Sequence, residues 1–294
     1  MYAFLRISEF YFDFPYQKNL DYFIFFGTIT GYNFVKYFEV TKFQHRSLST
    51  WLKFIQIFSL LCFVLMCYYS FRLEKTTMFY IAVFAVLTFL YTIPFIPKRK
   101  FLNKQSNLRN IGGLKVFLIA LVWVGVTVFI PLLNNHFSID RMVVTVSVQR
   151  FLLVIMLMLP FEIRDLQFDS LKLYTIPQNL GVKRTKILGI FLGLLMFVLE
   201  FLKREMSINQ IIVLLTILVL TVLLIWFSRE KQGRYYAAFW NSCFMVAFNA
   251  FYQLKFSPFN ALLNSFFKHS LFFLSMHLTL DCAIIEESLL LVFA

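Results

Sequence analysis

The chain is poor in the residues on which soluble catalytic and metal-binding domains depend. Its 294 residues include 15 acidic residues, nine glycines, four cysteines and four histidines. The cysteines form no CxxC pair and the histidines show no metal-ligand spacing, so the sequence does not indicate a zinc site. No glycine-rich phosphate loop is present, which excludes the nucleotide-binding motifs of soluble enzymes. Residues 1–19 mix aromatic and charged side chains and do not resemble a cleavable signal peptide.

Apolar side chains, in contrast, are abundant. Hydrophobic residues make up 60% of the chain and aromatic residues 20%, and the mean hydropathy of +0.74 excludes an ordinary soluble domain. Runs long enough to cross about 30 Å of hydrocarbon recur without the alternation typical of barrel strands. We therefore predict an all-α integral membrane protein, a polytopic bundle of about eight transmembrane helices. The predicted spans are 19–38, 52–71, 77–95, 114–133, 143–161, 184–202, 208–227 and 235–254.

The net charge of +13 is distributed unevenly between alternate loops of this predicted bundle. One set of loops carries fifteen Lys and Arg residues and the other set carries five. Cytoplasmic loops of membrane proteins are enriched in Lys and Arg, so the richer set is predicted to face the cytoplasm across a cell (inner) membrane. The basic balance therefore indicates topology, and it gives no reason to expect nucleic acid as a partner.

Three carboxylates cluster at the end of the predicted span 143–161. Glu162, Asp165 and Asp169 are spaced so that a continuing helix puts them within about 60° of one face and about 10 Å along its axis. Oxygen ligands in such an array suit Mg²⁺ that carries a phosphate-bearing substrate. The alternative is a solvated helix end, whose mutual repulsion Lys172 could also balance.

Counting the crossings places two further groups on the same predicted side as the carboxylates. Lys98 and Arg99 are candidates for neutralising the oxygens of a departing diphosphate, or else they anchor their loop at the membrane surface. Asn33 is a candidate for contacting a metal-bound phosphate, or else it caps a helix end. The sequence names no catalytic residue beyond these binding groups.

Other features concern the interior of the predicted bundle. Arg150 interrupts the span 143–161, and it either has a function or extends to the nearer interface. Arg164 is about 160° from the carboxylate face by the helical period, so we do not expect it to contact the same ligand. The patterns Gly27–Gly31 and Gly189–Gly193 allow close helix packing, which we interpret as packing within the chain rather than dimerisation.

Three segments resemble motifs of the UbiA superfamily of intramembrane prenyltransferases. Residues 160–169, together with 175–185, are similar to the family's second Asp-rich motif and the segment that follows it. Tyr91-Thr92-Ile93-Pro94, followed by Lys98-Arg99, is similar to the family's Tyr and Lys-Arg loop. Residues 33–37 stand at the place of the first Asp-rich motif, Asn-Asp-x-x-Asp, with Phe34 and Tyr37 where the aspartates are expected.

The resemblance implies a site and a division of the chain. In the family, the two motifs face each other and hold Mg²⁺ bound to the isoprenoid diphosphate. Here it implies that Glu162, Asp165 and Asp169 hold the metal, while Lys98, Arg99 and Asn33 bind the diphosphate. The family's first helix is then missing or truncated. Residues 1–18 are interpreted as an N-terminal remnant, 19–254 as the UbiA-like transmembrane domain and 255–294 as an atypical C-terminal tail.

These observations lead to a functional prediction with two alternatives. We predict Mg²⁺-dependent transfer of an isoprenyl group from a prenyl diphosphate to a lipophilic acceptor within the membrane lipid. The first alternative is a catalytically silent relative that binds a lipid or a partner, which Phe34 and Tyr37 favour. The second is a transporter. Transporters usually place polar groups near the membrane midplane on interrupted helices, whereas these carboxylates lie at a helix end.

Overall fold

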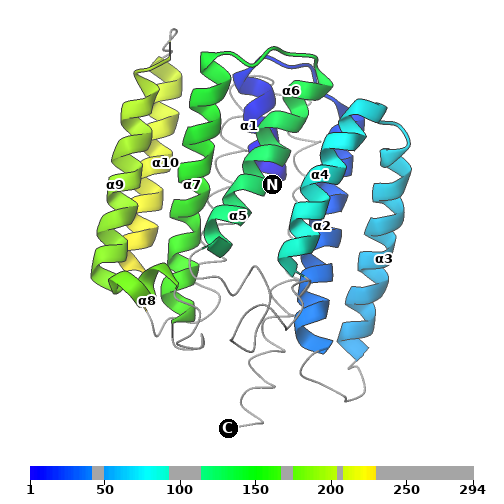
Figure 1. Cartoon of the computed structure of the whole chain (residues 1–294), viewed down its shortest axis with the longest axis horizontal. Helices are drawn as coiled ribbons and strands as arrows, with labels where there is room; N and C mark the ends of the chain where they lie inside the picture. Colours follow the sequence, from blue (N-terminus) through cyan, green and yellow to red (C-terminus); the bar gives the residue numbers. More distant parts are fainter. Residues whose placement is uncertain (42–49, 93–113, 167–174, 204–207, 230–294) are drawn as a thin grey trace, which may run out of the picture. The chain divides into compact units, whose positions relative to one another are not determined.

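The computed structural model describes the chain except for residues 42–49, 93–113, 167–174, 204–207 and 230–294. Every regular element in the described part is helical, which confirms the prediction of an all-α protein for those residues. The described helices, which Figure 1 labels, belong to two compact units. The first contains α1 to α3 and the second contains α4 to α10.

The first unit consists of one short helix and two long ones. These are α1 (Tyr2–Tyr11), α2 (Lys18–Thr41) and α3 (Thr50–Ser70). At 1.5 Å per residue, α1 is about 15 Å long, half of what crossing the hydrocarbon core requires. Helices α2 and α3 pack along each other, and the ring of Tyr69 stacks on the rings of Tyr22 and Phe26. The predicted spans 19–38 and 52–71 are therefore helices.

The second unit is built around one long central helix, α7. Its elements are α4 (Lys75–Thr92), α5 (Leu114–Val124), the π-helical segment η2 (Gly125–Phe129), α6 (Ile130–Asn134), α7 (Arg141–Asp165), α8 (Ile176–Leu180), α9 (Val182–Glu200) and α10 (Ile208–Phe227). Helix α7 packs against α5, α9 and α10, and most of its side chains are buried. The carboxylate of Asp140 accepts a hydrogen bond from the backbone N–H of Val143 at 2.8 Å, which fixes where α7 begins.

The predicted span 114–133 is helical but not uniformly α-helical. The segment η2 widens the helix by one residue per turn next to α4. A Cβ atom at Gly125 would lie 2.1 Å from Cε1 of Phe84, so only glycine lets the Phe84 ring approach the backbone there. This turn is not visible in the sequence, because the Phe84 ring that packs on Gly125 is far away along the chain.

The two GxxxG patterns have different surroundings. In α9, a Cβ at Gly189 would lie 2.8 Å from Cδ1 of Ile225 in α10, and one at Gly193 would lie 3.1 Å from Cε of Met156 in α7. The interpretation of Gly189–Gly193 as packing within the chain is confirmed. In α2, a Cβ at Gly27 would make an ordinary contact with Met66, and one at Gly31 would meet nothing within 4 Å.

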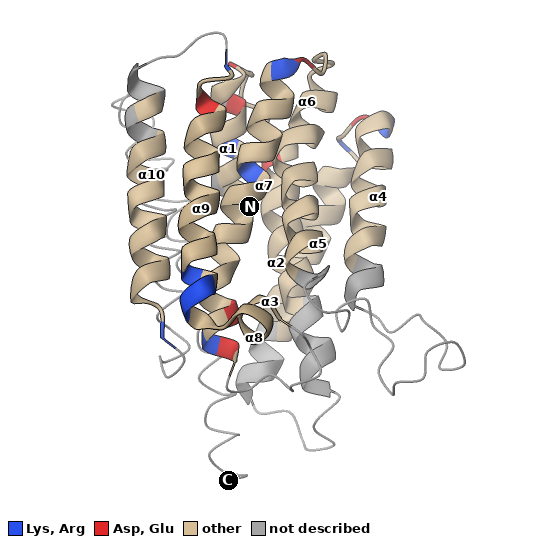
Figure 2. Cartoon of the chain, turned by 60° about the vertical axis from the view of Figure 1, so that its left-hand side comes forward, with Lys and Arg blue, Asp and Glu red and all other residues tan. Residues whose placement is uncertain are grey.

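The membrane prediction is supported by length and by surface. Two described helical stretches, Val116–Asn134 and Arg141–Asp165, are long and apolar enough to cross a membrane, and three more apolar stretches are shorter. Large side chains such as Phe79, Phe191 and Trp226 are exposed on the outer faces of their helices. Figure 2 shows the charged residues mostly near helix ends. The count of eight spans stays a prediction, and the span 235–254 lies outside the described residues.

Candidate functional site

The last turn of α7 carries the acidic residues that the sequence singled out. Pro160 lies inside the helix and has no N–H to donate to the carbonyl of Met156, which loosens the helix at that point. The helix nevertheless continues to Asp165, so Glu162 and Asp165 lie on successive turns at its end. The expected helical spacing of these two carboxylates is therefore present. Asp169 lies outside the described residues.

The two carboxylates differ in exposure and in their immediate contacts. Glu162 is only 2% exposed, whereas the side chain of Asp165 is 26% exposed. The Nε atom of Arg164 donates to Oδ1 of Asp165 at 2.7 Å, and the Arg164 guanidinium lies over the ring of Phe161. We expected Arg164 not to contact the same ligand as the carboxylates, which stays a prediction. Its side chain is long enough to reach the neighbouring residue.

The charge at this helix end favours a cation. The carbonyl end of a helix carries partial negative charge, which adds to the repulsion between Glu162 and Asp165. The guanidinium of Arg164 pairs with one of the two carboxylates, that of Asp165. Carboxylate oxygens are suitable Mg²⁺ ligands. Within the described part of the chain, however, no three metal-ligating side chains form a group that could hold an ion, so the fit of a metal depends on Asp169.

Of the other predicted binding residues, the structure describes Asn33 but not Lys98 or Arg99. Asn33 is half-buried in α2, which continues to Thr41, so the alternative that Asn33 caps a helix end is wrong. Asn33 belongs to the first unit and the carboxylates belong to the second. The structure thus brings Glu162 and Asp165 together and leaves the other candidates as predictions.

The segment after the carboxylates has a defined local structure. The side chain of Gln178 accepts a hydrogen bond from the backbone N–H of Thr175 at 3.1 Å, which holds the start of α8. Gly181 then separates α8 from α9 with φ of +79°, a conformation that favours glycine. The hydroxyl of Thr185 donates to the carbonyl of Gly181 at 2.9 Å. This part of the family-like segment is a tight helix–turn–helix connection.

A second polar cluster, which the sequence did not reveal, lies in the other half of α7. Gln149 Nε2 donates to Oε2 of Glu200 at 2.8 Å and to the carbonyl of Met196 at 3.1 Å. The same Glu200 oxygen accepts from Nζ of Lys203 at 2.5 Å, and both charged side chains are almost fully buried. Lys203 follows the end of α9, and its burial lowers the pKa of its ammonium group while Glu200 opposes that shift. This cluster joins α7 to the end of α9.

Arg150 follows Gln149 directly and is also buried, with 6% of its surface exposed. A side chain that extended to the lipid interface would be more exposed, so burial favours an interior role for Arg150. Polar residues within the predicted spans, Gln149 in 143–161 and Glu200 in 184–202, were the signal that could have pointed to the cluster. The pairing itself joins residues 51 positions apart and is not visible in the sequence.

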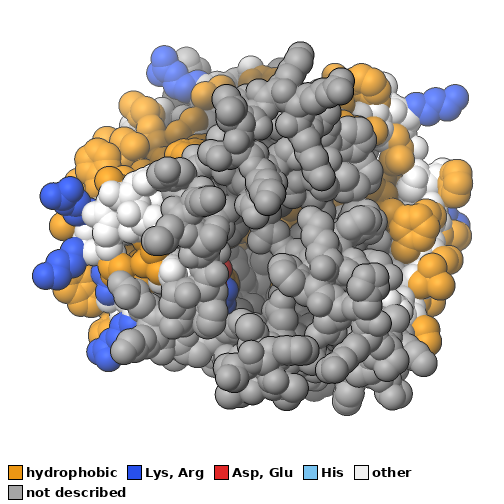
Figure 3. Space-filling model, turned by 60° about the horizontal axis from the view of Figure 1, so that its bottom comes forward, with side chains coloured by type: hydrophobic (Ala, Val, Ile, Leu, Met, Phe, Trp, Pro, Cys, Tyr) orange, Lys and Arg blue, Asp and Glu red, His pale blue; other side chains and the backbone are white. Residues whose placement is uncertain are grey.

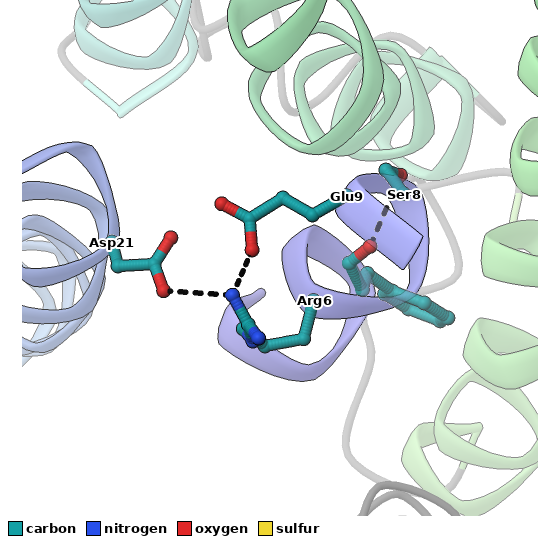
Figure 4. A network of polar contacts seen from close by, with 5 residues as sticks. Arg6, Ser8, Glu9 and Asp21 are labelled. Carbon is teal, nitrogen blue, oxygen red and sulfur yellow. Dashed lines mark hydrogen bonds and ion pairs between the residues drawn. The ribbon is translucent and has the colours of Figure 1, made fainter. Parts of the chain in front are cut away.

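The first unit has a polar network of its own between α1 and α2. Figure 4 shows Nη1 of Arg6 in α1 directed at the carboxylates of Glu9 and Asp21, with the Asp21 oxygen at 3.4 Å. Glu9 and Asp21 are both buried, and the guanidinium also lies over the ring of Tyr16. The predicted N-terminal remnant is therefore a helix that is tied to α2 through ion pairs.

Comparison with known proteins gives one distant likeness. No family model matches the sequence, and no curated protein matches it. Among solved structures, the chain is similar to one described as the structure of a UbiA homolog from Archaeoglobus fulgidus. The two share 12% sequence identity with a TM-score of 0.48, over 84% of this chain and 86% of that one. At this identity and TM-score, the similarity does not by itself place the chain in a family.

Proposed function

We propose that this chain is a membrane-embedded prenyltransferase of the UbiA type. The observation that carries the proposal is the acidic end of α7, where a buried Glu162 and a partly exposed Asp165 lie in the last turn of a helix long enough to cross a membrane. Negative charge at the carbonyl end of a helix is unfavourable unless a cation binds there. A cation at the end of an apolar helix suits a substrate with a phosphate head and a hydrocarbon tail.

In the proposed reaction, the allylic C–O bond breaks and the diphosphate leaves with the electron pair. The acceptor then bonds to the allylic carbon and releases a proton. When bound, Mg²⁺ supplies positive charge to the diphosphate oxygens. Glu162, Asp165 and Asp169 would hold that ion. Lys98, Arg99 and Asn33 would contact the diphosphate and stabilise the charge that develops as it departs.

The test is product formation by the purified protein. The protein is incubated with labelled prenyl diphosphates, Mg²⁺ and a membrane lipid extract, and prenylated lipid is separated and counted. We expect product with the unchanged protein and a loss of at least about a hundredfold in Asp165→Asn and Asp169→Asn, as is typical when a group that stabilises developing charge is removed. Glu74→Gln, which changes an exposed carboxylate outside α7, is the matched control and should retain activity. Equal activity in all variants would overturn the proposal.

A second candidate function is binding without turnover, which one contact favours. Arg164 already pairs with Asp165, so a guanidinium occupies part of the place that a metal would take. Phe34 and Tyr37 also remove the second pair of carboxylates that the family would supply. If the protein binds a prenyl diphosphate but forms no product with any acceptor in the extract, this second function replaces the first.

A further inference from the structure

Helices α9 and α10 share an exposed apolar face in the second unit. The two helices pack side by side. The face of α9 that carries Gly189 and Gly193 packs against α7 and α10, which leaves the other face of α9 exposed. Large side chains such as Phe191 and Leu194 of α9, and Leu223 and Trp226 of α10, are each between 45% and 62% exposed. A face of this kind needs an apolar environment, which lipid acyl chains provide.

One end of this face is basic. Lys183 and Arg184 are exposed in the first turn of α9, and Arg229 is exposed two residues after the end of α10. The ammonium group of Lys186 donates to the carbonyl of Trp226 at 2.7 Å, which brings the start of α9 against the end of α10. Figure 3 shows Lys and Arg side chains beside hydrophobic ones along its left-hand edge.

Basic residues predominate on α9 and α10 at this end. Between them, α9 and α10 contain one carboxylate, Glu200, which lies at the far end of α9 and is buried beside Lys203. Three exposed cations at one end of an apolar face match the two parts of a phospholipid. A phosphate headgroup accepts from guanidinium and ammonium donors, while acyl chains cover the apolar side chains.

We propose that this end of α9 and α10 binds an acidic glycerophospholipid. Lys183, Arg184 and Arg229 contact its phosphate and headgroup, and its acyl chains lie along the exposed face that includes Phe191 and Trp226. The position of Trp226 beside the cations agrees with this, because tryptophan favours the level of the lipid headgroups. The proposal requires that the protein is embedded in a membrane, but it does not require prenyl transfer.

Native mass spectrometry of the purified full-length protein in detergent tests the site without any substrate. Phosphatidylglycerol or phosphatidylcholine of the same acyl chains is added in steps, and the protein with bound lipid is counted. The triple variant K183Q/R184Q/R229Q removes the proposed contacts. The control R72Q/K75Q/R141Q removes the same number of exposed cations elsewhere on the chain. A melting curve of each variant establishes that it is folded, and R184Q alone serves if the triple variant is not.

We expect the unchanged protein to prefer phosphatidylglycerol and the first triple variant to bind it at least about tenfold more weakly. The control should lose less than about twofold. Glycerophosphate, which has the headgroup charge without the chains, should not displace the lipid at the same concentration. The proposal is overturned by equal losses in the two triple variants, by no preference for the acidic lipid, or by displacement with glycerophosphate.

Discussion

The two halves of α7 carry charge in different ways. In the first half, Gln149 donates to Glu200, which also accepts from Lys203, and all three side chains are enclosed by protein. In the last turn, Glu162 is buried but Arg164 and Asp165 remain partly exposed and contact each other. The first cluster is complete within the chain and holds two helices together. The second places two carboxylates on successive turns at a partly exposed helix end, which makes it the candidate for binding a ligand.

The largest effect is expected from breaking the enclosed cluster. Glu200→Ala leaves the ammonium group of Lys203 buried without its carboxylate, and losing one member of a buried ion pair costs about 3–5 kcal/mol. The variant should melt at a clearly lower temperature in a thermal unfolding assay in detergent. Glu200→Leu combined with Lys203→Met removes both charges and should recover most of that loss. If the double variant melts at the same low temperature as Glu200→Ala, the ion pair contributes more to stability than the mutual neutralisation of its two charges.

The contact between α7 and α9 lies between the two clusters. A substitution there should lower the stability of the protein less than Glu200→Ala does. Gly193→Val forces side-chain atoms against Met156 and should lower the free energy of unfolding by about 1–3 kcal/mol. Gly31→Ala in the other GxxxG pattern is the matched control. Its Cβ meets no atom within 4 Å, so its melting temperature should be unchanged or higher. Equal destabilisation of both variants would contradict the packing described for α9.

The last turn of α7 should affect stability least and depend most on ions. Arg164→Gln removes the guanidinium that pairs with Asp165, and a partly exposed ion pair contributes about 0–1 kcal/mol. Melting curves with and without Mg²⁺ provide the informative comparison. Without Arg164, the carboxylates depend on an added cation, so Mg²⁺ should raise the melting temperature of Arg164→Gln more than that of the unchanged protein. The same increase in both proteins would contradict the idea that Arg164 takes the place of a cation at this helix end.

The sequence was sufficient for the elements that depend on apolar runs. The predicted span 208–227 has the bounds of α10, and 143–161 lies within the longer α7. Helix α7 is longer than the predicted span because Asp140 caps its start and because the helix continues past Pro160 at its end. The glycine pattern in α9 was also interpreted correctly, because small residues four apart have one direct packing consequence.

Features that depend on partners far apart in the chain were not predictable. The ring of Phe84 packs against Gly125 in the π-helical turn, and Gln149 donates a hydrogen bond to the buried Glu200. Arg164 was placed by helical angle alone, which ignores the reach of a long side chain. At the candidate site, the spacing of Glu162 and Asp165 was predictable because both lie on one helix. Whether Lys98, Arg99 and Asn33 join these carboxylates was not predictable in the same way, because these residues lie on other segments of the chain.

The most direct test of the account is Mg²⁺-dependent binding of a labelled prenyl diphosphate to the purified protein. Binding is measured with Mg²⁺ and with a chelator, for the unchanged protein, for Asp165→Asn and for the exposed-carboxylate control Glu74→Gln. We expect binding that requires Mg²⁺, is lost in Asp165→Asn and is kept in Glu74→Gln. Binding that is unaffected by the chelator and by Asp165→Asn, or no binding at all, would contradict the assignment of the acidic end of α7 as a diphosphate site.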